Sequence, residues 1–407
     1  MRTGLDTPIS LVRGVYLPRG ADAAAFTMTS YGIPLLVLAT TGSASLTGLA
    51  FALAWIPRIG AFTVAGALVD RFGAARVFRA ACLARAGVVL LAAAFLAGLD
   101  EGTQAATVTV MLLAALTGVL TEFSYVAAET AGGAASRAAG TGAHRVQSVL
   151  LGIDQSAMLA GPALSGLLLE HTGPAAMLGV LAVFSLLAAA LGPREHPAPA
   201  DVALRKGGGL RAGWVTLRSL PALAWLVAGL MVSNGAVALL QAAMPVIVVT
   251  ELGRSSTDAG LIWSAAAFAS LLAITACRSA IDRWGLWPVG AVAAATAAGA
   301  TLALAHTSTY HGYVLLIAVL MAGEGGLAVV LRTLRSHLIP PHAFGSTLAV
   351  TILLLLLPYP TAGLLVAILP PAQLGHAITA AAILQAIGLS TAFIRLRTLP
   401  ALTTRPA

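Results

Sequence analysis

Eight ionisable side chains lie inside long apolar stretches of this 407-residue sequence. They are Arg19, Asp22, Arg58, Arg85, Glu122, Glu129, Asp154 and Glu324. An isolated charge at the centre of a lipid bilayer costs at least about 2.5 to 3.5 kcal/mol. Each group must therefore face a polar cavity, pair with an opposite charge or change its protonation state. The chemistry available to this set is ion pairing and proton transfer.

Distance along the predicted helices indicates which of these charges lie at the same depth. At about 1.5 Å per residue, Arg58 lies roughly 18 Å and Glu122 roughly 22 Å from the loop charges that end their spans. We therefore expect Arg58 and Glu122 to lie at one level, near the middle of the membrane. Arg85, Glu129 and Asp154 lie roughly 12 to 14 Å deep by the same rise, and they form a second level.

The carboxylates are the candidate proton carriers. We predict Glu122 as the leading carrier and Asp154 and Glu129 as the next, because a carboxyl group in a low-dielectric site can take up and release a proton. Arg19 and Asp22 are three residues apart, so they can pair on one face of a helix. The alternative is a set of static ion pairs that hold helices together. For any single residue the static ion pair is the favoured interpretation. For the eight ionisable residues taken together, a function in proton transfer is favoured.

Candidate substrate-binding residues are fewer and less specific. Glu324 lies in a glycine-rich stretch, Met321–Ala328, whose small residues allow close helix packing, and its carboxylate could bind a cationic group of a substrate. Four aromatic residues could line an apolar cavity: Trp55, Phe123, Tyr125 and Trp263. The alternative for these aromatic side chains is a place at the lipid interface.

The composition defines the elements that must position these residues. Hydrophobic residues make up 58% of the chain and charged residues 9%, and the mean hydropathy is +0.92. Because a water-soluble domain is about one-quarter charged, this composition excludes an ordinary cytosolic enzyme, a nucleic-acid-binding protein and a disordered chain. With about 20 apolar residues per transmembrane helix, twelve spans are predicted: Tyr16–Thr40, Leu46–Leu68, Val77–Leu99, Thr107–Ala128, Val146–Leu169, Thr172–Leu191, Ala222–Val249, Ala259–Cys277, Leu286–Ala305, Gly312–Leu331, Phe344–Leu369 and Ala377–Ile394.

The distribution of basic residues predicts the orientation of the chain. The net charge is +8, and nearly all basic residues fall in alternate loops and at the two ends, whereas Arg254 falls in a loop on the opposite side. Because cytoplasmic loops are enriched in arginine and lysine, both termini are predicted to be cytoplasmic. The N-terminal residues lack an apolar region, so no cleaved signal is expected. Cys82 and Cys277 have no spacing that indicates a disulfide framework or a metal site.

The chain divides into two related halves. Residues 193–221 contain prolines, glycines and mixed charges, a composition typical of a cytoplasmic linker, and they separate six-helix bundles at 1–192 and 222–407. The segment Gly66–Gly73 (GALVDRFG) matches Arg278–Gly285 (RSAIDRWG) at an offset of 212 residues. Repeated six-helix units are typical of transporters, with the substrate site near the membrane midplane.

At these residues the chain resembles the major facilitator superfamily. Its loop signature is matched by Gly66, Asp70, Arg71, Gly73 and Arg76, and the repeated copy retains Asp282 and Arg283. The resemblance implies an all-α fold of twelve transmembrane helices in two six-helix pseudo-repeats. It also implies that the loop residues form a latch on the cytoplasmic side. Within this loop, Gly66 is expected to let two helix backbones approach closely.

Three further segments are similar to the bacterial drug and siderophore exporter branch of this superfamily. The segment Ala160–Gly166 (AGPALSG) resembles the helix kink of its exporters, with Gly161, Pro162 and Gly166 as the matching residues. Tyr16–Ser43 and Trp55–Gly60 are also similar to that branch.

These observations predict a secondary transporter of the bacterial inner membrane, not an enzyme. It would export a small, partly apolar compound, such as a drug, antibiotic or siderophore, by proton antiport through alternating access. Its partners would be the substrate, protons and the lipid bilayer, without nucleic acid, metal or cofactor, and it would act as a monomer. One alternative is a proton-coupled nutrient importer. Another is a membrane enzyme acting on lipid-linked substrates, but the eight histidines are scattered. No P-loop sequence for ATP hydrolysis is present.

Overall fold

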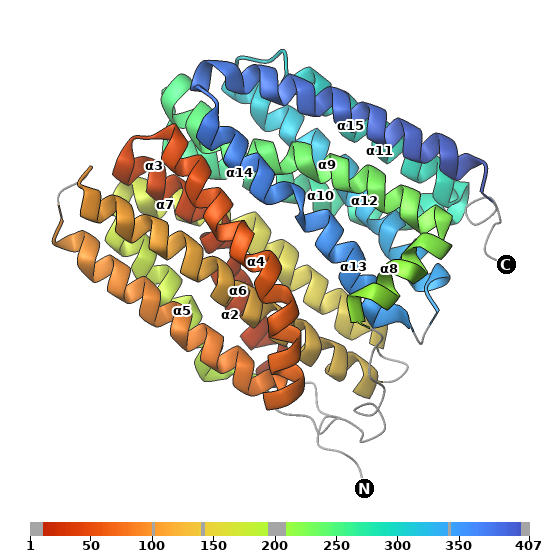
Figure 1. Cartoon of the computed structure of the whole chain (residues 1–407), viewed down its shortest axis with the longest axis horizontal. Coiled ribbons are helices and arrows are strands. Elements are labelled where there is room, and N and C mark those ends of the chain that lie inside the picture. The colour runs from red at the N-terminus through yellow and green to blue at the C-terminus, as the bar shows by residue number, and fades with distance from the viewer. Residues whose placement is uncertain (1–10, 100–101, 140–142, 194–208, 341–342, 400–407) are drawn as a thin grey trace, which may run out of the picture. The chain divides into compact units, whose positions relative to one another are not determined.

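The computed structural model describes residues 11–99, 102–139, 143–193, 209–340 and 343–399, and these residues form helices joined by short connections (Figure 1). The N-terminal helices are η1 (Val12–Tyr16), α2 (Leu17–Thr27), η2 (Met28–Gly32), α3 (Ile33–Thr41), α4 (Ala44–Phe72), α5 (Ala74–Ala97), α6 (Gln104–Ala138) and α7 (Ala143–Leu191). The remaining helices are α8 (Gly209–Ser219), α9 (Pro221–Val246), η4 (Ile247–Glu251), α10 (Ser256–Trp284), α11 (Leu286–Leu304), α12 (Tyr310–Leu338), α13 (Phe344–Leu356), α14 (Pro358–Ile368), η6 (Pro371–Gln373) and α15 (Leu374–Arg397).

The helices account for all the predicted membrane spans. Eleven helical segments of the described residues are long and apolar enough to cross a membrane. One of them, Ser148–Leu191, is 44 residues long, about twice the length that a bilayer requires. Its helix α7 contains a non-helical residue, Gly173, with φ +83°, so two predicted spans meet at this glycine. The predicted all-α membrane fold is confirmed.

Two helix ends show the internal repeat in their backbone geometry. Gly73 ends α4 with φ +86°, and its N–H donates to the carbonyl of Val69 at 2.9 Å. Gly285 ends α10 with φ +87°, and its N–H donates to the carbonyl of Ile281 at 2.8 Å. Residues with a side chain rarely adopt this φ, so glycine is required at both turns. The two turns lie 212 residues apart, as the sequence repeat predicts.

Contacts within the chain define two compact units. The first comprises the described residues of 1–199 together with 245–264, and the second those of 200–244 and 265–407. Residues 245–264, which fall in the predicted C-terminal half, pack with the first unit. Part of the predicted linker lies outside the described residues, and its last part forms the helix α8, which its composition did not predict.

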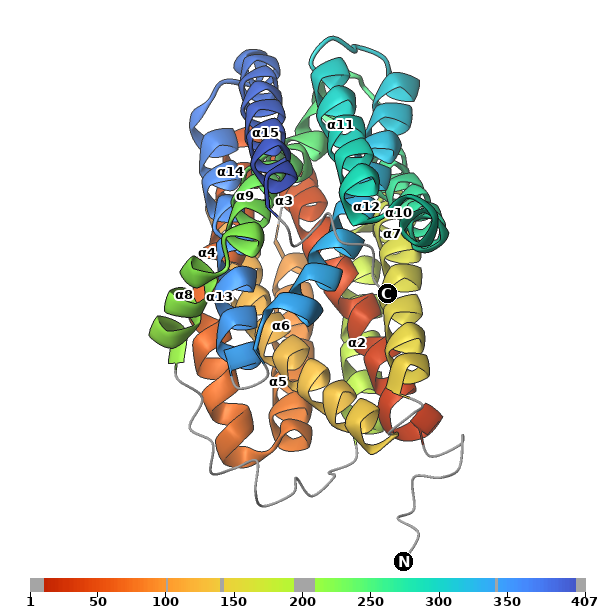
Figure 2. The same cartoon turned by 90° about the vertical axis from the view of Figure 1, so that its right-hand side faces the viewer.

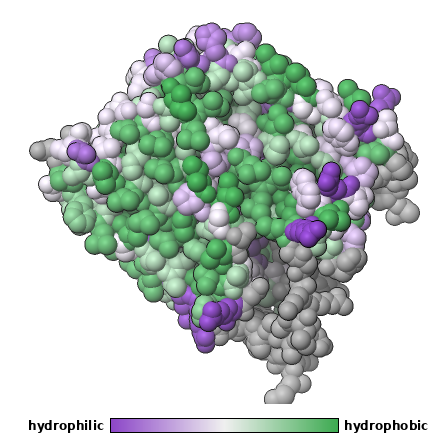
Figure 3. Space-filling view, in the orientation of Figure 1, coloured by the Kyte–Doolittle hydropathy of each residue, from purple (hydrophilic) through white to green (hydrophobic). Residues whose placement is uncertain are grey.

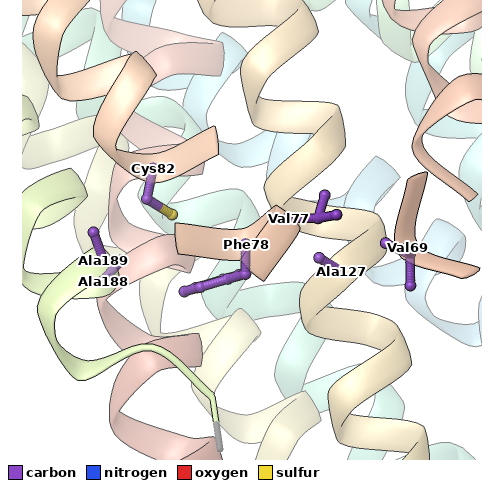
Figure 4. Close-up of a cluster of buried hydrophobic side chains, with 7 residues drawn as sticks. All are labelled: Val69, Val77, Phe78, Cys82, Ala127, Ala188 and Ala189. Atoms are coloured by element: carbon purple, nitrogen blue, oxygen red, sulfur yellow. The ribbon is translucent and has the colours of Figure 1, made fainter. Parts of the chain in front are cut away.

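The first unit surrounds a hydrophobic cluster next to the charged residues. Phe78 and Cys82 of α5 are fully buried, with Val69 of α4 and Ala127 of α6 on one side and Ala188 and Ala189 of α7 on the other (Figure 4). In both views of the chain, α4, α5 and α6 lie side by side (Figures 1 and 2). Arg85 lies one turn after Cys82 on the same buried side of α5. The packing around Phe78 and Cys82 therefore holds Arg85 in the interior of the unit.

The surface of the helices is largely apolar. Many leucine, isoleucine, valine and phenylalanine side chains are exposed, and they cover most of the face shown in Figure 3, whereas hydrophilic residues lie toward its margins. Apolar patches of this extent are unusual on a water-soluble monomer. The chain is therefore an integral membrane protein whose exposed apolar side chains face lipid.

Candidate functional site

Arg58 of α4 and Glu122 of α6 form a closed ion pair in the first unit. Arg58 Nε donates to Glu122 Oε2 at 2.5 Å, and the two side chains are only 7% and 3% exposed. The guanidinium also lies over the rings of Trp55, at 4.4 Å, and Phe26, at 4.7 Å. These contacts place Arg58 and Glu122 at one level, as their depths along the helices predicted. One carboxylate here balances one guanidinium.

A second closed pair joins Asp22 of α2 to Arg85 of α5. Arg85 Nη2 donates to Asp22 Oδ1 at 2.8 Å, and the two side chains are 0% and 4% exposed. Hydroxyl groups complete the shell, because Arg85 Nε donates to Ser185 Oγ at 2.9 Å and Nη1 to Ser124 Oγ at 3.2 Å. A buried guanidinium with its donors satisfied in this way is a stable structural unit.

The third cluster contains one arginine and two carboxylates. Arg19 of α2 donates to both oxygens of Asp154 on α7, each at 2.7 Å, and its Nη2 also donates to Glu129 Oε1 of α6 at 2.6 Å. Arg19 is 7% exposed, whereas Glu129 is 53% and Asp154 30% exposed. Tyr125 lies under the guanidinium at 5.3 Å. This cluster carries a surplus carboxylate, and its two carboxylates are the most exposed of the three clusters.

The pairing predicted within the first span is wrong. Arg19 and Asp22 share α2 but bind partners on different helices: Arg19 binds α6 and α7, and Asp22 binds α5. Neighbouring helices offer Arg19 a two-oxygen carboxylate contact, which is stronger than an interaction between residues three apart on one helix. Sequence spacing could not indicate this choice.

Taken together, the three clusters contain more acid than base. They combine Arg19, Arg58 and Arg85 with Asp22, Glu122, Glu129 and Asp154. With every group ionised, three positive and four negative charges leave a net charge of −1, and it falls on the Arg19 cluster. Protonation of Glu129 or Asp154 makes the whole set neutral.

Glu324 lies in the second unit among neutral partners. Ser233 Oγ of α9 donates to Glu324 Oε1 on α12, and Gln385 Nε2 of α15 donates to Ser233 Oγ at 2.7 Å and to Glu324 Oε1 at 3.4 Å. In the described part of the chain, Glu324 forms no ion pair, and Gln385 Oε1 is buried without a hydrogen bond. Gly323 and Gly326 bring α12 close to α11, which agrees with the packing role expected for these glycines.

The predicted aromatic residues separate into two groups. Trp55 and Tyr125 lie against the arginines of the ion pairs, and Trp263 packs on Tyr31 with ring centroids 5.4 Å apart. Phe123 instead packs against the hydrophobic cluster around Phe78. Phe123 therefore contributes to the core beside the site.

Two glycines of the loop signature lie in different surroundings. Gly73 is required by its positive φ, but Gly66 faces open space, since an added Cβ would meet nothing within 4 Å. The expected close helix approach at Gly66 is therefore wrong. Close approach of α4 to α6 occurs instead at Gly118, where a Cβ would overlap the backbone of Ala54.

The charged residues of the signature are mostly exposed. Arg71 lies over Phe72 at 5.1 Å, and Arg283 over Trp284 at 5.6 Å. Arg76 and Asp282 are also exposed. The side chain of Asp70 lies outside the described part of the structure, so its place in the predicted latch remains a prediction.

The glycines of the predicted kink pack tightly against other helices. A Cβ at Gly161 would overlap Thr27, and one at Gly166 would overlap the backbone of Ser256. Gly260 of α10 has the same relation to the carbonyl of Pro162. Pro162 does not interrupt α7, which breaks at Gly173. In this structure the small residues allow close helix contact.

Sequence reasoning missed the neutral partners of the buried charges. Five side chains each contact an ionisable group: Phe26, Ser124, Ser185, Ser233 and Gln385. The sequence marks the serines and the glutamine only as polar residues within apolar runs. Many serines in membrane helices have that position, so it does not indicate a charged partner. Among the described residues, no group of three or more His, Cys, Asp or Glu is placed to hold a metal ion.

Buried ion pairs inside a bundle of membrane-spanning helices are typical of polytopic membrane proteins that move ions or substrates. The sequence profile of the Major Facilitator Superfamily matches residues 20–359. The chain therefore belongs to the Major Facilitator Superfamily and is a transporter rather than an enzyme.

Solved structures of the same fold cover nearly the whole chain. A D-xylose–proton symporter is 15% identical with a TM-score of 0.73, and the match covers 96% of this chain and 97% of the symporter. A bacterial homologue of the iron transporter ferroportin in an inward-facing state is 17% identical with a TM-score of 0.68, covering 98% and 100%. No curated protein matches the sequence significantly. At these identities the structural likeness shows the fold alone.

Proposed function

We propose that this transporter exports a small, partly apolar compound in exchange for protons by alternating access. It would act as a monomer in the bacterial inner membrane, with both termini in the cytoplasm. The single observation that carries the proposal is the surplus carboxylate at Arg19. A net charge of −1 that includes an exposed carboxylate can be neutralised by a proton or by a cationic substrate group, which is the competition that antiport requires.

The geometry favours Glu129 as the residue that exchanges protons with solvent, and Asp154 as its partner. Glu129 is the most exposed carboxylate of the three clusters and makes a single contact with Arg19. Glu122 was the leading candidate by sequence, but it is nearly enclosed with Arg58. We propose that Glu122 acts deeper in the protein, where separation from Arg58 accompanies the conformational change.

Substrate recognition is proposed for groups in each of the two units. Trp55, Tyr125 and Trp263 supply apolar and aromatic surface in the first unit. Glu324 supplies a carboxylate without a cationic partner among the described residues, which suits an ammonium group. Export, in preference to import, rests on the exporter-like segments Tyr16–Ser43 and Ala160–Gly166.

The test measures accumulation and coupling separately. Cells that lack their own efflux pumps and express the transporter would be loaded with ethidium, a cation, or chloramphenicol, a neutral compound, before and after a protonophore. Expression should lower accumulation of at least one compound, and the protonophore should restore it. Unchanged accumulation of both compounds would contradict export, and raised accumulation would favour the importer.

Purified protein in liposomes then tests the coupling residue. Glu129→Gln should abolish uptake into these liposomes that a pH gradient drives, but it should retain exchange of labelled for unlabelled compound. Glu251→Gln, which alters a carboxylate at η4 away from the clusters, is the matched control and should transport normally. Gradient-driven transport by Glu129→Gln at the parent rate would reject Glu129 as the proton site.

A further inference from the structure

The second unit carries four tryptophans that each lie beside an arginine. The pairs, called here the Arg–Trp pairs, are Arg218 over Trp214 at 5.9 Å, Arg283 over Trp284 at 5.6 Å, Arg395 over Trp225 at 5.6 Å and Arg397 over Trp287 at 5.7 Å. All four arginines are exposed, and so are three of the tryptophans. The transport mechanism proposed above uses none of these contacts, and among their residues Arg283 alone belongs to the predicted latch.

The Arg–Trp pairs lie at one end of the unit. Trp284 ends α10, Trp287 begins α11, Trp225 begins α9, and both Arg395 and Arg397 end α15. Successive spans run in opposite directions, so these starts and ends fall on the same side of the membrane. The distribution of basic residues predicts that this side is cytoplasmic. The indole N–H of Trp287 donates to the carbonyl of Phe393 at 3.1 Å, which fixes α11 to the end of α15.

Helix α8 adds a surface that is both apolar and basic. Its Leu217 is buried, and a Cβ on Gly213 would overlap the backbone of Ser346 at the start of α13, so one face of α8 is held against α13. The opposite face exposes Trp214 and Val215, at 44% and 60%. Exposed Arg211 and Arg218 lie on that same face. A helix with this pattern lies in the interface between lipid headgroups and acyl chains.

We propose that the Arg–Trp pairs and the outer face of α8 form a binding site for the headgroups of anionic phospholipids. An indole ring holds the guanidinium plane by a cation–π contact and sits at headgroup depth, where the free edge of the guanidinium can bind phosphate oxygens in pairs. Anionic lipids of the cytoplasmic leaflet are attracted to such basic segments.

Competing acidic groups are few at this surface. In the described part of the chain, Arg211, Arg218, Arg283, Arg395 and Arg397 form no ion pair. Asp282 is exposed next to Arg283, which makes that pair the weakest candidate. The remaining arginines keep their charge available for an anion, and the exposed apolar side chains beside them favour a lipid over a soluble partner.

The experiment compares lipids on the purified full-length protein. Native mass spectrometry and thermal unfolding would be measured with phosphatidylglycerol, phosphatidylcholine, inorganic phosphate or poly-glutamate. We expect the parent to bind phosphatidylglycerol at least about tenfold more tightly than phosphatidylcholine and to melt several degrees higher with it. Equal binding of the two lipids, or displacement of phosphatidylglycerol by inorganic phosphate at millimolar concentration, would overturn the proposal. Tighter binding of poly-glutamate than of phosphatidylglycerol would do the same.

Two variants and a matched control locate the site. The triple variant R218Q/R395Q/R397Q should lose most of the preference for phosphatidylglycerol. R13Q/R79Q/R332Q removes the same charge from exposed arginines that lie outside the Arg–Trp pairs, and it should keep the preference within about twofold. Equal loss in both would show attraction by diffuse charge and reject the site. R218K/R395K/R397K keeps the positive charge but removes the planar guanidinium, so it should fold even where folding requires the charge. It should retain less than half of the preference for phosphatidylglycerol.

Discussion

The Arg85–Asp22 pair provides a sharp test of which buried charges are structural. Asp22→Asn leaves Arg85, whose side chain is 0% exposed, without its carboxylate. Breaking a buried ion pair by removing one partner costs about 3 to 5 kcal/mol, because the remaining charge is buried and uncompensated. Since each 1.4 kcal/mol changes an equilibrium about tenfold, local opening around Arg85 should become about 10² to 10³ times more frequent.

A cysteine already present in the chain can report this opening. Cys82 is fully buried, its Sγ lies 3.7 Å from Asp22 Oδ1, and it lies one turn before Arg85. With Cys277→Ser removing the other cysteine, the rate at which a membrane-permeant maleimide labels Cys82 measures how often this region opens. We expect Asp22→Asn to raise that rate by about 10² or more.

Two further variants test whether the uncompensated charge of Arg85, and not a general loss of stability, causes the faster labelling. Glu129→Gln removes a carboxylate that is half exposed and leaves Asp154 on Arg19, so labelling of Cys82 should change less than about fivefold. The double variant D22N/R85Q removes the uncompensated charge and should recover to within about tenfold of the parent. Labelling of Asp22→Asn at the parent rate would refute the assignment of a structural role.

Three other outcomes follow from the packing. Gly73→Ala should lower stability by about 1 to 3 kcal/mol because its backbone conformation excludes a side chain, whereas Gly66→Ala, in open space, should be neutral; thermal unfolding in detergent distinguishes them. Gly260→Leu should overpack against α7 and lower the free energy of unfolding by about 1 to 3 kcal/mol, whereas Gly152→Leu, in open space, should not. Equal unfolding midpoints for the two variants would contradict the close contact at Gly260. Glu324→Gln should reduce export of ethidium but leave export of chloramphenicol unchanged. Accumulation assays with both compounds measure this difference, and an equal effect on the two compounds would contradict the prediction.

Composition determined most of the fold, because a bilayer admits few solutions. A chain with 9% charged residues must satisfy its backbone within helices, and the apolar runs set their number. The repeat around Gly73 and Gly285 was also readable, since both glycines meet the same backbone requirement. Depth along the helices correctly placed Arg58 level with Glu122, because the rise per residue is fixed.

Only the tertiary structure decided which charges meet and which helices touch. Arg19 and Asp22 are neighbours in sequence, yet each faces a different helix, because the rotation of α2 about its axis is set by packing. The surplus carboxylate at Arg19, the neutral shell around Arg85 and the fold of α8 onto α13 all depend on contacts between segments far apart in the chain. Sequence fixes the depth of a residue in the membrane, whereas the direction of its side chain is fixed by the neighbours it packs against.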